Sequence, residues 1–342
     1  MRAVAVTAPH ALEIVDIAEP AGDRGVIVAL DRMGLCGTDV AILRGNRPIT
    51  YPRVLGHELV GHVIRSSAQG LIAEGTTVIV NPAIDCGRCR ECRADRANLC
   101  TNGGLVGRDV DGGFTEMIAV DDERLLPVPS GYPIHSAVSL QVLGTCVHAQ
   151  STVAAFPGQT AVVIGLGVSG LLMVQLLRAR GLRVLGVTRS AWKRALGERL
   201  GATAVTSPEH AAGVLGELTG GAGADIVVEA AGTVGTLNHA IELAANGGHI
   251  VMFGTIARSG AGGGDPAELN FYRIYHGQLT LHGTRAALQR DYQRGIDLAV
   301  SGVIDLAPLY THEFPLSRAR DAFAALEGDP KALKVALNPA PA

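Results

Sequence analysis

The sequence has no excess of basic charge and no long apolar segment. Its 29 Lys and Arg residues are balanced by 32 Asp and Glu residues, which leaves a net charge of −3. Without a basic stripe to follow the phosphates, a nucleic acid is not an expected partner. A membrane-spanning helix needs roughly 18 to 20 consecutive apolar residues, and no window reaches that length. The N-terminus also lacks the basic start and apolar run of a secretion signal, so we expect a cytoplasmic protein without a membrane partner.

Cysteine is also scarce, with six residues in a chain of 342. This number is too small for a disulfide scaffold in a chain of this size. Four of the six lie between residues 86 and 100, which in a reducing compartment indicates metal binding. The hydrophobic content of 47% is ample for two packed cores, so the length predicts two domains.

The pattern of short segments changes along the chain. Up to about residue 125 it shows short strands bounded by Gly, Pro or Asp, which predicts an irregular, mostly β domain. From Thr160 onward, apolar strands alternate with helix-length segments, the pattern of a parallel sheet covered on both faces. Six strands are expected, at 160–165, 182–188, 203–206, 225–230, 249–254 and 279–283. The glycine-rich stretch 259–265 is expected to be a flexible loop, and the tail to pack on the first domain with a final strand near 331–337.

The clearest chemical motif is a cluster of four cysteines, Cys86, Cys89, Cys92 and Cys100. Four thiolates at this spacing can close a tetrahedral shell around one zinc, which leaves no position open for a substrate. The site would therefore brace a loop. The alternatives are a chance clustering of cysteines, a pair of disulfides, or a site in which the four sulfurs hold an iron–sulfur cluster.

A second group of possible ligands is divided between GLCGTD and GHELVG. Cys36, His57 and Glu58 offer a thiolate, an imidazole and a carboxylate. Such a mixed set leaves room for a substrate oxygen, as catalytic zinc sites do. Taken alone, a His next to a Glu in the sequence is more often a pair of ordinary surface or core residues than a pair of metal ligands.

An apolar strand, a glycine-rich turn and an amphipathic helix follow one another from residue 161. The turn is Gly165-Leu166-Gly167-Val168-Ser169-Gly170. Its glycines allow a tight turn and close approach to a pyrophosphate, whose charge the amides and the helix N-terminus stabilise. The strand before and the helix after favour dinucleotide binding over a merely structural turn.

Along the chain, CGTD is followed by GHExxG, then by the four-cysteine loop and then by the GxGxxG turn. These four motifs in this order resemble the zinc-containing medium-chain dehydrogenase/reductase family, which includes alcohol and polyol dehydrogenases. The resemblance runs the length of the chain. It implies an α/β protein with a GroES-like, β-rich catalytic domain at 1–148 and 285–342 that carries the structural zinc loop. It further implies a Rossmann domain at 149–284, a doubly wound parallel six-stranded sheet, with catalysis in the cleft between the two domains.

The resemblance also implies roles for single residues. Cys36, His57 and Glu58 match the ligands of the catalytic zinc, and Asp39 matches the acid that steadies the metal-binding histidine. Thr38 matches the hydroxyl residue that meets the substrate oxygen, although a hydroxyl here could simply cap a turn.

The chain departs from the family pattern at two positions. Gln141 stands where many relatives have a Cys or Glu that can serve as a further zinc ligand. Its neutral amide oxygen would bind the zinc loosely, or a water molecule would bind there instead. Nearby Cys146 is either a substitute ligand or a buried structural thiol. Ala41 stands where many relatives carry a histidine that passes the proton to solvent. The proton relay beyond Thr38 is therefore unassigned.

The end of the second predicted strand bears on the choice of cofactor. Thr188 lies where proteins that prefer NAD usually place an acid, and Arg189 and Lys193 follow. A 2′-phosphate could pair with Arg189 and accept a hydrogen bond from Thr188 or Ser190, so we expect NADP in preference to NAD. The alternative is that Arg189 and Lys193 only form the solvated start of the next helix.

The sequence thus predicts a zinc-dependent enzyme that moves a hydride between a secondary alcohol, such as a polyol, sugar or cyclic alcohol, or its ketone, and NAD(P). It would hold one catalytic and one structural zinc and form a homodimer or homotetramer. The alternatives are a zinc-independent enoyl or quinone reductase of the same fold, or a non-catalytic nucleotide-binding protein. Arg47, Tyr51, Arg108 and Arg285 are candidates for the substrate pocket, or ordinary exposed loop residues.

Overall fold

The computed structural model describes residues 1–21, 25–67, 70–256 and 268–339. The chain forms two compact units, each described here by itself. Unit 1 contains Met1–Gly144, Ala287–Val300 and Leu306–Ala342, and unit 2 contains Thr145–Ala286 and Ser301–Asp305. The expected boundaries at 148/149 and 284/285 stay a prediction, and the expected loop at 259–265 lies outside the described residues.

Unit 1 is built mainly from strands. These are β1 (Arg2–Ala8), β2 (Ala11–Asp16), β3 (Val26–Gly34), β4 (Arg53–Val54), β5 (Glu58–Arg65), β6 (Thr77–Val80), β7 (Ala83–Ile84), β8 (Gly104–Leu105), β9 (Met117–Val120), β10 (Leu125–Pro127), β17 (Tyr310–Pro315) and β18 (Lys334–Asn338). The largest sheet has the order β10-β6-β5-β3-β18-β17, with β9 also paired to β3. Strands β2, β1 and β4 form a second sheet, and β7 and β8 a third.

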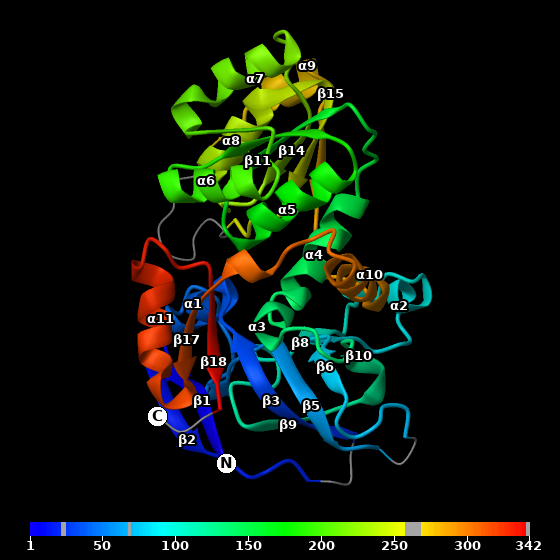
Figure 1. The fold of residues 1–342 in the computed structure, drawn as a ribbon, viewed down its shortest axis with the longest axis vertical. Coiled ribbons are helices and arrows are strands. Elements are labelled where there is room, and N and C mark those ends of the chain that lie inside the picture. Colours follow the sequence, from blue (N-terminus) through cyan, green and yellow to red (C-terminus); the bar gives the residue numbers. More distant parts are fainter. Residues whose placement is uncertain (22–24, 68–69, 257–267, 340–342) are drawn as a thin grey trace. The chain divides into compact units, whose positions relative to one another are not determined.

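The C-terminal strand, β18, lies inside the largest sheet, between β17 and the N-terminal strand β3. Strand β18 pairs antiparallel with β3, through Ala336 opposite Gly34 and Leu337 opposite Met33. Gly34 also lies opposite Glu58 of β5. The expected final strand is therefore present, and it brings the tail next to the middle of the sheet (Figure 1).

The helices of unit 1 are short. They are α1 (Gly37–Leu43), α2 (Arg90–Arg93), α3 (Ile134–Ala137), α10 (Gln289–Val300) and α11 (Ala319–Gly328), with 3-10 turns η1 (Ala97–Leu99), η2 (Asp122–Arg124), η4 (Ala307–Leu309) and η5 (Leu316–Arg318). The unit boundary falls inside α4 (Leu140–Ser151).

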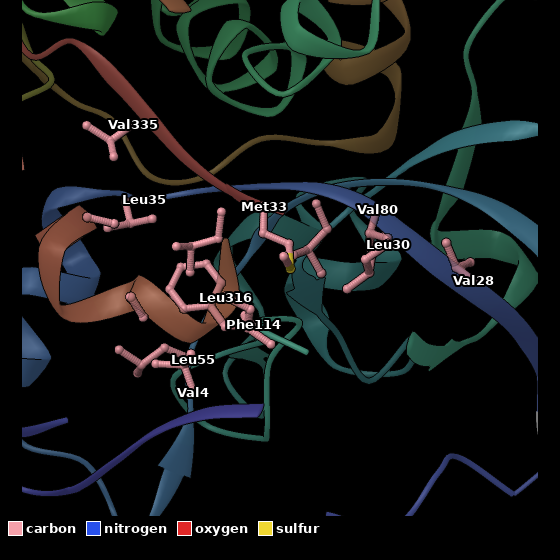
Figure 2. Packing of buried hydrophobic residues seen from close by; sticks show 14 of the residues in the cluster. Val4, Val28, Leu30, Met33, Leu35, Leu55, Val80, Phe114, Leu316 and Val335 are labelled. Carbon is pink, nitrogen blue, oxygen red and sulfur yellow. The ribbon is translucent and has the colours of Figure 1, made fainter. Parts of the chain in front are cut away.

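The core of unit 1 lies between the large sheet, β1 and α11. Figure 2 shows Val4, Leu55, Phe114 and Leu316 gathered on one side of the strand that carries Met33. The Phe114 and Phe323 rings meet edge to face, with centroids 6.5 Å apart. Burying aromatic and aliphatic surface from strands far apart in the chain holds the β framework on which the candidate ligands are mounted.

Unit 2 has a Rossmann sheet, as predicted. Its six strands are parallel, in the order β13-β12-β11-β14-β15-β16. Their bounds are β11 (Thr160–Ile164), β12 (Arg183–Val187), β13 (Ala204–Thr206), β14 (Ala224–Glu229), β15 (Ala244–Met252) and β16 (Thr280–Gly283). Order and direction match the dinucleotide-binding fold.

Helices cover both faces of this sheet (Figure 1). They are α5 (Val168–Ala179), α6 (Ala191–Arg199), α7 (Ala211–Thr219), α8 (Val234–Leu243) and α9 (Phe271–His276), with η3 (Pro208–His210). All five residues of β11 are buried, which explains why this strand is a continuous apolar run. Among the described residues, no helix has the length and apolar character needed to span a bilayer.

Candidate metal and cofactor sites

Cys36 is held by the first turn of α1. It is the N-cap residue, and its Sγ accepts a hydrogen bond from the backbone N–H of Thr38 at 3.5 Å. In return, Asp39 Oδ2 accepts from the N–H of Cys36 at 2.9 Å. The CGTD motif is therefore a capping box that fixes the thiol at the start of the helix.

Asp39 also faces His57. Its Oδ1 lies 3.5 Å from His57 Nδ1, and both side chains are buried. Neither atom has a hydrogen-bond partner in the described part of the chain. A modest approach of the two would close the carboxylate–imidazole contact that orients a metal-binding histidine.

Glu58 begins β5 and points across β3. A Cβ added to Gly34 would lie 2.3 Å from Glu58 Oε2, so only glycine leaves room for this carboxylate. Glu58 is paired with the ammonium of Lys334 at the start of β18, and both side chains are almost fully buried. Because an isolated buried charge is costly, the pairing with Lys334 offsets part of the cost of burying the Glu58 carboxylate.

The three predicted ligands come together. One donor atom each from Cys36, His57 and Glu58 lies within 4.8 Å of the others. Burial alone would lower the pKa of His57, but the Asp39 charge and the Cys36 thiol raise it well above its ordinary value. The same negative surroundings that favour a proton on the ring favour a metal cation.

The two candidates for a further ligand have different surroundings. Gln141 is buried and hydrogen-bonds to Tyr292, whose pKa is raised by burial and, to a smaller extent, by the charges of Asp291 and Glu58. Gln141 therefore shares a neighbour with Glu58. Cys146 is fully buried, and its thiol donates to the Ser169 carbonyl at 3.7 Å, as a structural thiol would.

Thr38 lies close to a cation. Arg47 Nη1 donates a hydrogen bond to Thr38 Oγ1 at 3.4 Å. The Tyr51 hydroxyl instead donates to the Ile42 carbonyl at 3.3 Å, and Arg108 contacts Asp109. Among Arg47, Tyr51 and Arg108, Arg47 is thus the residue that contacts a predicted catalytic hydroxyl.

The four-cysteine loop is compact. Its Sγ atoms are 3.5 Å apart for Cys89 and Cys92, 3.8 Å for Cys89 and Cys100, and 3.5 Å for Cys86 and Cys100. Four thiolates about 2.3 Å from one zinc lie about 3.8 Å from each other, so the donor set fits that ion. All six cysteines of the chain are described, and none forms a disulfide.

The loop is also prepared electrostatically. Backbone N–H groups of Cys92 and Thr101 lower the pKa of the Cys89 thiol to about 5. Desolvation and hydrogen bonds with the neighbouring thiols of Cys89 and Cys100 raise the pKa of the Cys92 thiol to about 12. The loop is tied to α10, because Arg290 is ion-paired with Asp95.

The glycine-rich turn follows β11 with the geometry a phosphate needs. Gly165 has φ +93, in the left-handed region that favours glycine. A Cβ on Gly170 would lie 1.8 Å from the Gly165 carbonyl oxygen, so this glycine permits the close turn into α5. A Cβ on Gly167 would meet nothing within 4 Å, which leaves open space at the helix N-terminus.

The loop after β12 carries the residues predicted to recognise the ribose. The Thr188 N–H donates to the Thr206 carbonyl, and Thr188 Oγ1 accepts from the N–H of Ser190 at 3.4 Å. Arg194, which sequence reasoning did not single out, donates to the carbonyls of Thr188 and Arg189 at 2.9 and 3.0 Å. Lys193 lies over the Trp192 ring at 5.6 Å.

Comparison with known proteins agrees with this geometry. The model of the alcohol dehydrogenase GroES-like domain matches residues 22–130, and that of the zinc-binding dehydrogenase matches residues 168–301. A structure described as a zinc-binding dehydrogenase from Sinorhizobium meliloti 1021, bound to NADP, is 32% identical, covers 99% of both chains and has a TM-score of 0.88. The chain belongs to the zinc-containing medium-chain dehydrogenase family.

More distant relatives of the dehydrogenase have sugar-like substrates in their names. L-galactonate-5-dehydrogenase from Escherichia coli K12 is 28% identical over 88% of this chain and 88% of its own length. Sorbitol dehydrogenase from Bacillus subtilis 168 is 26% identical over 92% of this chain and 90% of its own.

Three residues of the site had no sequence motif to reveal them. Lys334 and Tyr292 lie far along the chain from the groups they contact, Glu58 and Gln141. Arg194 is one of several basic residues in its helix. An isolated Lys, Tyr or Arg carries no spacing signal, so only the fold identifies their partners.

Proposed function

We propose that this dehydrogenase is a zinc- and NADP-dependent oxidoreductase of secondary alcohols, with polyols or sugar derivatives as substrates. The observation that carries the proposal is the meeting of a thiol, an imidazole and a carboxylate from Cys36, His57 and Glu58 within 4.8 Å. Asp39 lies behind the imidazole. Such a three-ligand set suits a catalytic zinc with an open position.

Cys36, His57 and Glu58 would hold the ion, and Gln141 is the candidate for a weak further ligand. When bound, zinc supplies Lewis-acid stabilisation of the substrate alkoxide, worth several kcal/mol of the barrier. A neutral amide at Gln141 would leave this charge less neutralised than a thiolate or carboxylate, which favours a more electrophilic metal.

The remaining residues orient the substrate and move its proton. The Thr38 hydroxyl would take up the proton of the substrate O–H as it gives up its own proton toward solvent, while Asp39 would hold the His57 ring in place. A nicotinamide cofactor, when bound, would accept the hydrogen of the carbinol carbon as a hydride, so that the alcohol becomes a carbonyl. Reduction of a ketone follows the same steps in reverse.

Recognition of the cofactor is assigned to the turn 165–170 and to the loop after β12. Gly167 leaves space for the pyrophosphate at the start of α5. Thr188 and Arg189 would receive a 2′-phosphate, because no carboxylate is present there to repel it. The NADP bound to the Sinorhizobium relative supports this preference.

The four-cysteine loop would hold a second, structural zinc. Closed tetrahedral thiolate sites leave no place for a substrate, so its role is to stabilise the loop from Cys86 to Cys100. We also propose that the protein is a cytoplasmic homodimer or homotetramer, in keeping with the family resemblance.

The proposal is tested by metal analysis combined with turnover. Two zinc ions per chain are expected, together with oxidation of polyols or sugar derivatives that is faster with NADP than with NAD. One zinc per chain, retained at the cysteine loop, with reduction of an enoyl or quinone substrate would replace the proposal by the zinc-independent reductase. Nucleotide binding without any turnover would favour the non-catalytic alternative.

A further inference from the structure

We propose that Tyr292 is a positioning residue of the site formed by Cys36, His57 and Glu58. It orients the Gln141 carboxamide so that the amide oxygen, and not the nitrogen, is available to the metal. The inference rests on the proposed function, in which Gln141 is the candidate for a weak further ligand. It adds a residue of α10 that no motif of the sequence identifies.

Tyr292 and Gln141 meet where α10 packs against the start of α4 (Figure 1). A Cβ added to Gly144 would lie 2.2 Å from Tyr292 Cδ1, so the absence of a side chain at position 144 makes room for the tyrosine ring. A Cβ on Gly295, three residues further along α10, would lie 3.3 Å from the Gly144 N atom. Residues three apart share a helix face, so Gln141 lies on the face of α4 that Gly144 turns toward α10.

The hydrogen bond between the two side chains has a defined direction. Burial raises the pKa of Tyr292, whereas the hydrogen bond with Gln141 lowers it. A partner lowers the pKa of a phenol when it donates to the phenol oxygen, because this donation stabilises the ionised form. The Gln141 amide N–H is therefore the donor, and the Tyr292 oxygen is the acceptor.

Donation by the amide nitrogen decides which end of Gln141 can act as a ligand. A carboxamide has donor N–H groups at one end and an acceptor oxygen at the other, and only the oxygen suits a cation. With its nitrogen bonded to Tyr292, Gln141 has Oε1 on the opposite side of the amide. The charge of Glu58 acts on the same phenol, so Gln141, Tyr292 and a predicted zinc ligand belong to one buried group.

The orientation of the amide depends on the tyrosine hydroxyl because the group is enclosed. Gln141 and Tyr292 are 6% and 1% exposed, so bulk water has little access to replace the hydrogen bond. Without the hydroxyl, the amide could turn over and present its N–H groups to the metal. A carboxylate at position 141 would have no such requirement, because its two oxygens are equivalent.

The test compares full-length wild type with Tyr292→Phe, with Gln141→Ala, with Gln141→Glu, and with Tyr292→Phe combined with each change at position 141. Tyr310→Phe is the matched control, because it removes a hydroxyl from another tyrosine of unit 1, one that donates to Glu313. The zinc affinity of the site that contains Cys36 is measured by chelator competition. Co²⁺ exchanged into that site reports its coordination through the visible spectrum. Thermal unfolding of each variant is recorded as well.

We expect Tyr292→Phe to weaken zinc binding about tenfold, the lower end of the cost of losing a group behind a metal ligand. Gln141→Ala should give a similar loss and the same change in the Co²⁺ spectrum, and the combined change should add nothing further. Gln141→Glu should bind zinc at least as tightly as wild type and lose less than about twofold on addition of Tyr292→Phe. Tyr310→Phe should resemble wild type.

Unchanged zinc affinity and Co²⁺ spectrum in Tyr292→Phe would overturn the inference. Additive losses from Tyr292→Phe and Gln141→Ala, or an equal loss in the Gln141→Glu protein, would also overturn it, since Tyr292 would then act through the fold and not through Gln141. A wild type without zinc beside Cys36 would contradict the inference and the proposed function together. Zinc binding that depends on Tyr292, but without hydride transfer, would contradict the proposed function alone.

Discussion

Glu58 and Lys334 form a buried pair whose energetics differ from those of a surface salt bridge. Their side chains are 2% and 3% exposed, and the residues are 276 positions apart. Desolvating two charges is costly, and their attraction offsets that cost only while both are present. A metal ion bound by Glu58 would be a second cation beside the same carboxylate. The positive charge of Lys334 would therefore weaken the attraction between Glu58 and the metal.

Replacing Lys334 by Met should destabilise the metal-free protein by about 3 to 5 kcal/mol, because Glu58 is left buried and unpaired. Zinc should restore part of this loss, since it supplies the missing positive charge. Urea unfolding with and without zinc measures both effects. Lys331→Met is the control, because Lys331 is exposed, and an equal effect of the two changes would contradict the argument.

Thr188→Asp should reverse the cofactor preference. A carboxylate at the end of β12 would repel a 2′-phosphate and accept hydrogen bonds from free ribose hydroxyls. The ratio of kcat/KM for NADP to that for NAD should fall by about tenfold or more, equivalent to about 1.4 kcal/mol. Arg189→Gln should weaken NADP alone. If neither change alters the ratio of kcat/KM for NADP to that for NAD, the loop after β12 does not bind the 2′-phosphate.

At the scale of elements, the turn from β11 into α5 shows two different uses of glycine. Gly170 lies against the Gly165 carbonyl, so its lack of a side chain serves the fold. Gly167 has φ −76, which any residue adopts, and faces open space. The fold therefore does not require a glycine at position 167, and we propose that its lack of a side chain leaves room for the cofactor pyrophosphate.

Gly167→Ala should fold normally and bind NADP at least about tenfold more weakly, because the methyl group occupies the pyrophosphate space. Gly170→Ala should instead lower the melting temperature, since its Cβ collides with backbone. Thermal unfolding and cofactor titration separate the two. Unchanged NADP affinity in Gly167→Ala would exclude this turn as the phosphate site.

The cysteine loop from Cys86 to Cys100 has little regular structure of its own, only the short helices α2 and η1, and the two-residue strands β7 and β8 flank it. Cys89→Ser should remove one zinc per chain and raise amide exchange between residues 86 and 100, because metal binding replaces a hydrophobic core there. Cys146→Ala should keep both ions. Loss of a zinc from Cys146→Ala would show that this thiol is a ligand after all.

For the whole molecule, the two metal sites should empty separately. The Cys36, His57 and Glu58 group would offer three protein ligands and an open position, whereas the loop would enclose its ion with four thiolates. A chelator should therefore abolish turnover first, with the fold retained, and release the loop zinc later with a fall in melting temperature. Released zinc, turnover and circular dichroism are followed together. Loss of both ions in one step would contradict separate roles.

Unit 1 is assembled from both ends of the chain, because unit 2 is inserted between residues 144 and 287. Strand β3 lies between β5 and β18, so Gly34 is opposite Glu58 on one side and Ala336 on the other. Lys334, two residues before Ala336, thereby comes within reach of Glu58. The site depends on this register as much as on its ligands.

The sequence by itself determined those features that are formed by residues close together in the chain. The alternation of apolar strands with helix-length segments predicted the six parallel strands. The glycine positions predicted the turn at 165–170, and the cysteine spacing predicted the four-thiol loop. Each of these features forms within a short segment of the chain. The ligand set Cys36, His57 and Glu58 followed from motifs joined by a family resemblance.

Only the tertiary structure decided which distant groups meet. The pairing of Glu58 with Lys334, the contact of Gln141 with Tyr292 and the approach of Arg47 to Thr38 arise from strand register, helix packing and a turn. A single charged or aromatic residue belongs to no repeating pattern or spaced motif from which its contact could be predicted. Its role is therefore set by the neighbours that folding brings to it.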